Sequence, residues 1–129
     1  MAIATLETWH ELVESRNVAG LDALLADAIV FYSPVVHTPQ RGRQAALMYL
    51  TAAFHVFLNE SFRYVRELRD EHQAILEFEM EIDGISINGV DMIKWDEDGR
   101  INEFKVMIRP LKGVNMIHQK MAAMLEAAR

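Results

Sequence analysis

Several residue types that mark particular protein classes are missing or scarce in this chain of 129 residues. Cysteine is absent, so the chain can form no disulfide framework or thiolate metal site and holds no cysteine nucleophile. This composition is compatible with a reducing compartment. Proline occurs 3 times and glycine 6 times, and no segment rich in either marks a linker. One domain spanning residues 1–129 is therefore predicted.

Basic residues are too few for a nucleic-acid-binding surface. Lys and Arg number 13 against 19 Asp and Glu, which gives a formal net charge of -6, and no segment concentrates basic with aromatic residues. No apolar run approaches the ~20 residues of a membrane-spanning helix, and residues 1–17 lack the features of a signal peptide. We therefore expect a cytoplasmic protein that binds neither nucleic acid nor membrane.

Apolar residues in the first half of the chain recur mainly at helical spacing. The pattern predicts a helix ending near Arg16, a second short helix that Asn17 can cap and that carries Leu25, and a third helix over about residues 43–58. The β-branched and aromatic run over residues 29–32 predicts a strand that is followed by an irregular loop.

The second half of the chain changes to the two-residue period of strands. Apolar and acidic side chains alternate over residues 76–82, and Asp83-Gly84 is a strong hairpin signal. We expect an antiparallel meander of four strands, and then a last helix from about Gly113 to Ala127. Helices gathered ahead of antiparallel strands indicate an α+β fold, in which helices cover one face of the sheet.

Alternation along the strands assigns charged side chains to the outer face of the sheet. Glu77, Glu79 and Glu81 share one face of their strand. Lys105 and Arg109 lie on the same face if the last strand joins the same sheet. We interpret these side chains as cross-strand charge pairs rather than as a catalytic carboxylate cluster.

The strand from Gly89 to Trp95 has no cleanly polar side. If Lys94 points outward with the other charges, Asp91 points inward, onto the helix-covered face. A carboxyl group there loses hydration, which raises its pKa and suits it to acid or base chemistry or to donating a hydrogen bond. Asp91 is therefore the best functional candidate. Two alternatives remain open: an Asp that only satisfies a neighbouring Trp or Ser side chain, and the opposite parity, with Asp91 outward.

Other motifs give little support for a metal or cofactor site. The five histidines lack metal-site spacing, and no phosphate-binding glycine loop or nucleophile elbow occurs, so neither a metal nor a cofactor is expected. His37 lies in the loop after the first expected strand, where ligands are often bound, although such a histidine is more often simply exposed.

Three local patterns, together with the order of the elements, carry a family resemblance. They are Ser33-Pro34-Val35 at the end of the first strand, Gly42 before the third helix, and residues 89–101 with Asp91 and an Asp-Gly-Arg-Ile turn. The chain resembles the nuclear transport factor 2-like superfamily, and its SnoaL-like polyketide cyclase branch most of all. The resemblance implies a cone, in which a curved sheet wrapped by helices surrounds an apolar pocket. It also implies a homodimer that pairs through the outer sheet face and binds a small hydrophobic molecule.

Branches of this superfamily suggest roles for individual residues. Asp91 lies where ketosteroid isomerases place a protonated aspartic acid of their oxyanion hole. Ser33 stands at the general-base position of that branch and Trp9 at its oxyanion tyrosine, and neither can do the same chemistry. The Arg-x-Asp arrangement of limonene epoxide hydrolases is missing, and Arg109 lies where an acid commonly ends the last strand. SnoaL-type cyclases use one aspartate as acid and base, which Asp91 can supply.

We therefore predict a pocket in which Asp91 acts as acid, base or hydrogen-bond donor on a carbonyl, in isomerase, cyclase or lyase chemistry through an enolate. Ser33 and His37 are expected beside it. The expected walls are Trp9, Phe31, Leu50, Phe54, Phe78, Met80, Ile93, Val106 and Ile108. The alternatives are a non-catalytic ligand-binding or dimerisation module and a pocket filled by its own side chains. The last helix, which the isomerase comparison does not explain, is expected to cover the pocket mouth or to extend the dimer.

Overall fold

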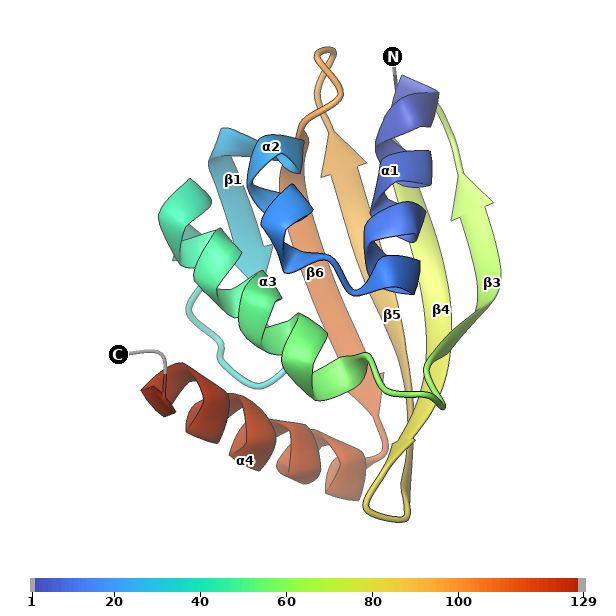
Figure 1. Ribbon diagram of the computed structural model, residues 1–129, viewed down its shortest axis with the longest axis vertical. Helices are drawn as coiled ribbons and strands as arrows, with labels where there is room; N and C mark the ends of the chain where they lie inside the picture. Colours follow the sequence, from blue (N-terminus) through green and yellow to red (C-terminus); the bar gives the residue numbers. More distant parts are fainter. Residues whose placement is uncertain (1, 128–129) are drawn as a thin grey trace.

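Six strands form one curved sheet, and the helices lie over one of its faces (Figure 1). The computed structural model describes residues 2–127, and their side chains from Thr5 onward. The strand order is β2-β1-β6-β5-β4-β3. Along the chain the elements are α1 (Ala2–Ser15), η1 (Val18–Gly20), α2 (Leu21–Leu24), β1 (Leu25–Tyr32), β2 (Gln40–Arg41), α3 (Arg43–Phe57), β3 (Arg63–Arg69), β4 (Gln73–Ile82), β5 (Ile85–Trp95), β6 (Ile101–Arg109) and α4 (Leu111–Ala127).

The α+β class predicted from the sequence is confirmed, including the meander and the last helix. Strands β3 to β6 pair antiparallel in sequence order, and Asp83-Gly84 forms the tight turn between β4 and β5, with both residues at positive φ. Figure 1 shows α1 over β4 and β5, and α3 over β1 and β6. The apolar faces of helices and strands therefore meet in one core between the two layers.

The first strand is longer than the sequence pattern predicted. Leu25, which was expected in the second short helix, instead begins β1 opposite Ile101 of β6 and is fully buried. Strand β1 pairs in parallel with β6, which is far away in the sequence. This long-range pairing outweighs the local helical spacing of the apolar residues. Asn17 does cap the short helical segment as predicted, since its side-chain oxygen accepts the Ala19 N–H at 3.1 Å.

The charge pairs on the outer face differ from the predicted ones. Glu79 pairs with Arg63 at 2.7 Å, and Glu77 pairs with Arg66 at 3.1 Å, so both partners lie on β3 rather than on β6. The reason is strand order, because β5 separates β4 from β6 and places Lys105 and Arg109 two strands away. Among the described residues, Lys105 lies over the ring of Tyr32 instead, at 4.8 Å from its centroid.

None of the helices within residues 2–127 is both long and apolar enough to cross a membrane. The longest is α4, which has 17 residues and buries only Gly113, Ile117 and Met121. It packs beside α3 at one end of the sheet (Figure 1).

Gly89 in β5 lies where neighbouring groups leave no space for a side chain. A Cβ at this position would lie 2.5 Å from Phe78 Cζ, 2.7 Å from Ile108 Cγ2 and 2.7 Å from the backbone oxygen of Met107. We expect Gly89→Ala to lower the free energy of unfolding by about 1–3 kcal/mol through overpacking, measured by urea denaturation.

The matched control is Gly113→Ala in α4, whose Cβ would meet Ile87 Cγ1 at 3.1 Å. This contact is looser, and Ala is favoured over Gly in a helix by about 1 kcal/mol. Equal losses for the two variants would contradict the assigned role of Gly89.

Candidate functional site

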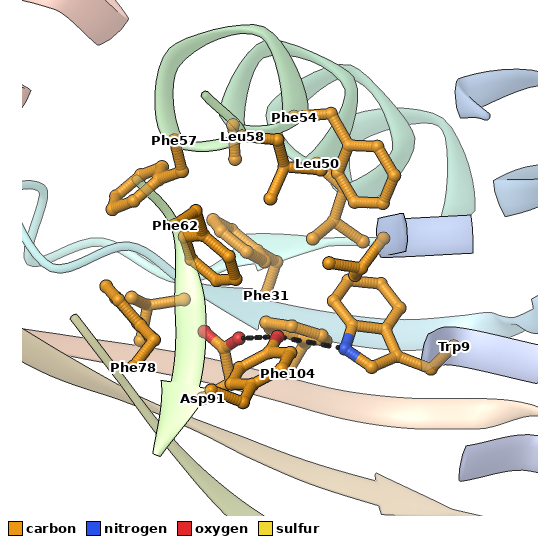
Figure 2. Close-up of a pocket in the computed structure, with 14 residues that line it drawn as sticks. Trp9, Phe31, Leu50, Phe54, Phe57, Leu58, Phe62, Phe78, Asp91 and Phe104 are labelled. Atoms are coloured by element: carbon orange, nitrogen blue, oxygen red, sulfur yellow. Dashed lines mark hydrogen bonds between the residues drawn. The ribbon is translucent and has the colours of Figure 1, made fainter. Parts of the chain in front are cut away.

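Aromatic side chains from both layers surround a small cavity between the helices and the sheet (Figure 2). Its volume is about 40 Å³, which leaves room for only a few water molecules. The cavity walls are Trp9, Val13, Phe31, Leu50, Ala53, Phe54, Phe57, Leu58, Phe62, Tyr64, Phe78, Asp91, Phe104 and Val106. Asp91 supplies the only carboxyl group among these lining residues.

Asp91 reaches the cavity because of its register in the sheet. It stands opposite Leu76 of β4 and Val106 of β6, which are both buried, and its own exposed fraction is 7%. Figure 2 shows its carboxyl group directed into the space among the aromatic rings. Lys94 is exposed and Asp91 is buried, so Asp91 points inward, as an outward Lys94 predicted.

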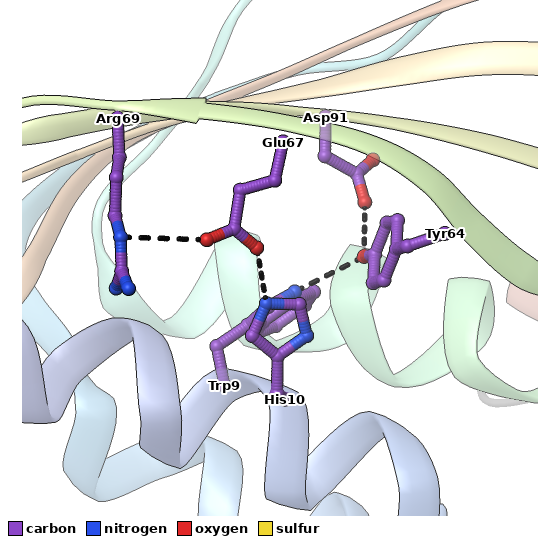
Figure 3. A network of polar contacts seen from close by, with 6 residues as sticks. All are labelled: Trp9, His10, Tyr64, Glu67, Arg69 and Asp91. Carbon is purple, nitrogen blue, oxygen red and sulfur yellow. Dashed lines mark hydrogen bonds and ion pairs between the residues drawn. The ribbon is translucent and has the colours of Figure 1, made fainter.

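A short chain of hydrogen bonds fixes the Asp91 carboxyl group (Figure 3). The Tyr64 hydroxyl donates to Asp91 Oδ2 at 2.6 Å, and the Trp9 indole N–H donates to the Tyr64 hydroxyl oxygen at 3.1 Å. An indole N–H can only donate, so the direction of the chain is set and the Tyr64 hydrogen points at Asp91. Asp91 Oδ1 has no hydrogen-bond partner among the residues described, which leaves this oxygen available to a ligand in the cavity.

Burial governs the protonation of both groups. Loss of hydration raises the pKa of Asp91 to about 7, although the hydrogen bond from Tyr64 opposes the shift. Burial also raises the pKa of Tyr64 well above its usual value, and the charge of Asp91 adds to this effect. At neutral pH, Tyr64 therefore stays protonated, while Asp91 is divided between the acid and the carboxylate and can act as either.

A second polar network lies beside the first, closer to solvent (Figure 3). His10 Nε2 lies 2.8 Å from Glu67 Oε1, and Arg69 Nε lies 3.4 Å from Glu67 Oε2. The His10 ring packs edge-on against Tyr64, with 5.4 Å between ring centroids. Trp9 and His10, which are consecutive in α1, thus both contact β3, and each contacts Tyr64.

Six of the nine predicted wall residues line the cavity, and three do not. Met80, Ile93 and Ile108 belong to the core or pack against it but lie outside the cavity lining. Their inward parity is correct, but they stand too far along their strands from Asp91. The residues that do line it are Trp9, Phe31, Leu50, Phe54, Phe78 and Val106.

Ser33 and His37, which were expected beside the cavity, do not line it. The chain leaves the sheet after Tyr32, and the Ser33 hydroxyl oxygen accepts the Val35 N–H at 3.1 Å within the turn. His37 is exposed in the following loop. The last helix also contributes no side chain to the cavity wall, because it packs against α3 and the end of the sheet. The expectation that this helix covers the pocket mouth is therefore wrong.

Sequence reasoning missed Tyr64, which is the hydrogen-bond partner of Asp91. The signal in the sequence was weak. Phe62 and Tyr64 are two residues apart, so they point to the same face of an expected strand, and aromatic residues on the inner face usually only fill the core. Within residues 2–127, no cluster of three or more His, Asp or Glu side chains could hold a metal ion. The chemistry of this site therefore depends on one carboxyl group and the two side chains that position it.

Comparison with known proteins identifies the family. A sequence model of the SnoaL-like domain matches residues 6–104. The chain belongs to the SnoaL-like family. This confirms the resemblance found in the sequence, although a search of proteins with curated function finds no match.

Several solved structures are similar to this SnoaL-like protein. A steroid delta-isomerase from Pseudomonas aeruginosa is 38% identical, with a TM-score of 0.93 over 98% of this chain and 93% of that chain. An uncharacterized protein with a cystatin-like fold from Silicibacter pomeroyi is 31% identical, with a TM-score of 0.84 over 92% of this chain and 83% of that one. The epoxide hydrolase/cyclase-like enzyme SalBIII of salinomycin formation shares the fold at 15% identity, with a TM-score of 0.65 over 84% and 90% of the two chains.

The raised pKa of Asp91 predicts a specific pH dependence of stability. Between its usual value of 3.8 and about 7, the folded state binds more protons than the unfolded state, so stability falls as pH rises. From pH 5 to pH 8 we expect the wild type to lose roughly 2.5 kcal/mol of unfolding free energy relative to Asp91→Asn, measured by urea denaturation at each pH.

The control for this measurement is Tyr64→Phe, which removes the hydrogen bond that lowers the pKa of Asp91. In this variant the loss of stability should extend to higher pH than in the wild type. Parallel pH profiles for the wild type and Asp91→Asn would mean that Asp91 titrates as an ordinary exposed carboxyl group.

Proposed function

We propose that this SnoaL-like protein binds a small hydrophobic carbonyl compound in the aromatic cavity, with Asp91 acting as acid and base on it through an enolate. One observation carries the proposal: a carboxyl group with one free oxygen lies in an aromatic cavity and is held there by Tyr64. The isomerase and cyclase relatives support the same class of chemistry.

A single carboxyl group suits a reaction that returns the proton it removes. For a β,γ-unsaturated ketone, carboxylate Oδ1 takes the proton from the α-carbon, and the electrons of that C–H bond form the dienolate. Oδ1–H then returns the proton to the γ-carbon, which gives the conjugated ketone and restores the carboxylate. No second base is needed, and this fits a cavity wall that Ser33 does not reach. A pKa of Asp91 of about 7 makes both transfers feasible near neutral pH.

The alternative is a SnoaL-like protein that binds its ligand without turnover. It is favoured by the hydrogen-bond chain itself, because the Trp9 N–H donates to Tyr64 and the Tyr64 hydroxyl donates to Asp91. Neither donor is then free for an enolate oxygen unless the chain rearranges. Turnover is what separates the two functions.

We expect Asp91→Asn to abolish turnover of a β,γ-unsaturated ketone while ligand binding is largely kept. Removing a positioned acid/base group lowers the rate by about 10²–10⁴-fold. The measurement follows ultraviolet absorbance as the ketone becomes conjugated, with cyclohex-3-en-1-one and androst-5-ene-3,17-dione as substrates. In the wild type the rate should rise with pH through about 7, as Asp91 ionises.

Ser33→Ala is the matched control and should keep the wild-type rate, because Ser33 does not line the cavity. An Asp91→Asn variant with the wild-type rate would overturn the catalytic role. A wild type that binds both ketones without converting them would favour the non-catalytic alternative.

We further propose that two copies pair through the outer face of the sheet. Four apolar side chains lie next to one another there: Ile75 and Met92 are cross-strand neighbours, as are Val90 and Met107. Ile75 and Met107 are 41% and 50% exposed. A contiguous apolar patch of this kind marks an interaction surface, and the twofold axis of a homodimer would bring two identical patches together.

Met107→Glu should convert this dimer to a monomer, because the new charge would be desolvated in the interface. The measurement is size-exclusion chromatography with light scattering. Leu111→Glu is the control, since Leu111 is also exposed but begins α4, outside the patch. A monomeric wild type would contradict the proposed pairing.

A further inference from the structure

A second hollow lies directly outside the Asp91 cavity. It has a volume of about 400 Å³ and is bordered by His10, Val13 and Glu14 of α1, by Arg16 just after that helix, by residues 58–60 and by residues 62–64, where β3 begins. Four residues border both spaces: Val13, Leu58, Phe62 and Tyr64. These four side chains form a wall that the outer hollow shares with the cavity that holds Asp91.

The volumes of the two spaces show that neither alone makes a complete site. Ligand pockets usually measure about 300–1,000 Å³, whereas the Asp91 cavity measures about 40 Å³. The outer hollow is large enough, but it lacks the carboxyl group. A ligand of this size that touches Asp91 needs more space than the cavity offers, and the outer hollow lies just beyond the shared wall.

Of the two aromatic side chains in this wall, Phe62 can move at lower cost than Tyr64. Tyr64 is held by hydrogen bonds to Asp91 and Trp9. The Phe62 side chain is apolar and packs against the core, stacked on Phe78 at 5.2 Å and edge-on to Tyr64 at 5.1 Å between centroids. The Phe62 ring borders both spaces, and its rotation would break no polar contact.

The backbone next to Phe62 is fixed, so the opening depends on the ring rather than on the whole segment. Asn59 Nδ2 donates to the Glu81 backbone oxygen at 2.9 Å, and the Glu81 N–H donates to Ser61 Oγ at 2.8 Å. The Ser61 N–H in turn donates to Asn59 Oδ1 at 2.8 Å. The two bonds to Glu81 tie residues 59–61 to β4 and would be lost if the segment swung away, while the third holds Ser61 to Asn59 within the segment.

Charges around the outer hollow indicate which end group it accepts. Arg63 is paired with Glu79, and His10 lies within hydrogen-bonding distance of Glu67. Glu14, Glu60 and Arg16 also border the hollow, and none of these three forms an ion pair within the described part of the chain. The two carboxylates disfavour an anionic group. Because carboxylates accept and the guanidinium donates hydrogen bonds, the border suits a neutral group that does both.

We propose that the cavity and the outer hollow form one two-part binding site, divided by the Phe62 ring. Its ligand is an elongated molecule with a carbonyl or phenol group at Asp91 and a neutral hydroxyl or amide group in the outer hollow. This inference rests on the proposed function, because it takes Asp91 as the polar end of the site.

The first test needs no ligand. The chain has 2 tryptophans, so Trp95→Phe leaves Trp9, on the cavity wall, as the only reporter. In this background, Phe62→Ala should raise acrylamide quenching of Trp9 fluorescence several-fold. Phe57→Ala is the matched control, because Phe57 also packs against Phe78 but does not border the outer hollow. Equal quenching in the two variants would overturn the role of Phe62. If Trp95→Phe does not fold, Trp95→Tyr provides the background.

The second test uses three probes that share a naphthol ring: 2-naphthol, 6-hydroxy-2-naphthamide and 6-hydroxy-2-naphthoic acid. We expect the amide to bind several-fold more tightly than the acid, and Glu14→Gln with Glu60→Gln to remove most of this difference. Phe62→Ala should speed association of the amide, while Phe57→Ala should not. Calorimetry and stopped-flow fluorescence give the two readouts.

The outcomes separate this inference from the proposed function. If the probes bind in a manner that depends on Asp91, but show neither the amide preference nor the Phe62 effect, the two-part site is wrong and the proposed function stands. If neither the wild type nor Phe62→Ala binds any probe, the cavity is not a ligand site and both proposals fail.

Discussion

The burial of one carboxyl group, that of Asp91, is the constraint on which the rest of this site depends. An unpaired carboxylate in an aromatic cavity is costly, and two features reduce the cost. Tyr64 donates a hydrogen bond to one oxygen, and the pKa rises to about 7, so the neutral form is available near neutral pH. Tyr64 is in turn held by Trp9. Three elements, α1, β3 and β5, must therefore keep their relative positions for Asp91 to be tolerated.

The contact between α1 and β3 both builds the site and limits access to it. Trp9 and His10 are consecutive in α1, and they bind Tyr64 and Glu67 of β3. Strand β3 lies at the edge of the sheet, so this helix contact fixes it from one side while β4 pairs with it on the other. The outer hollow opens along the same contact. A ligand thus approaches Asp91 past the residues that hold the carboxyl group in place.

The sequence predicted which face each residue occupies better than how far along the strand it lies. An outward Lys94 was enough to predict that Asp91 points inward, because side chains alternate strictly along a strand. The same rule could not separate Phe78, which lines the cavity, from Met80, which has the same parity two residues further on. That difference depends on strand register and on the position of the covering helix, and both are set by distant parts of the chain. The pairing of β1 with β6 was missed for the same reason.

On the proposed function, the Tyr64 hydroxyl changes its hydrogen-bond acceptor as the proton moves. While Asp91 is a carboxylate, the bond from Tyr64 to Oδ2 is charge-assisted and strong. When Oδ1 takes the proton from the substrate, the negative charge leaves Asp91 and appears on the enolate oxygen. The bond from Tyr64 to Oδ2 then weakens, and the Tyr64 hydrogen can turn towards the new charge, while Trp9 still donates to the Tyr64 oxygen. A site with one carboxyl group can in this way supply the base first and an oxyanion donor afterwards, which two-carboxylate sites divide between separate residues.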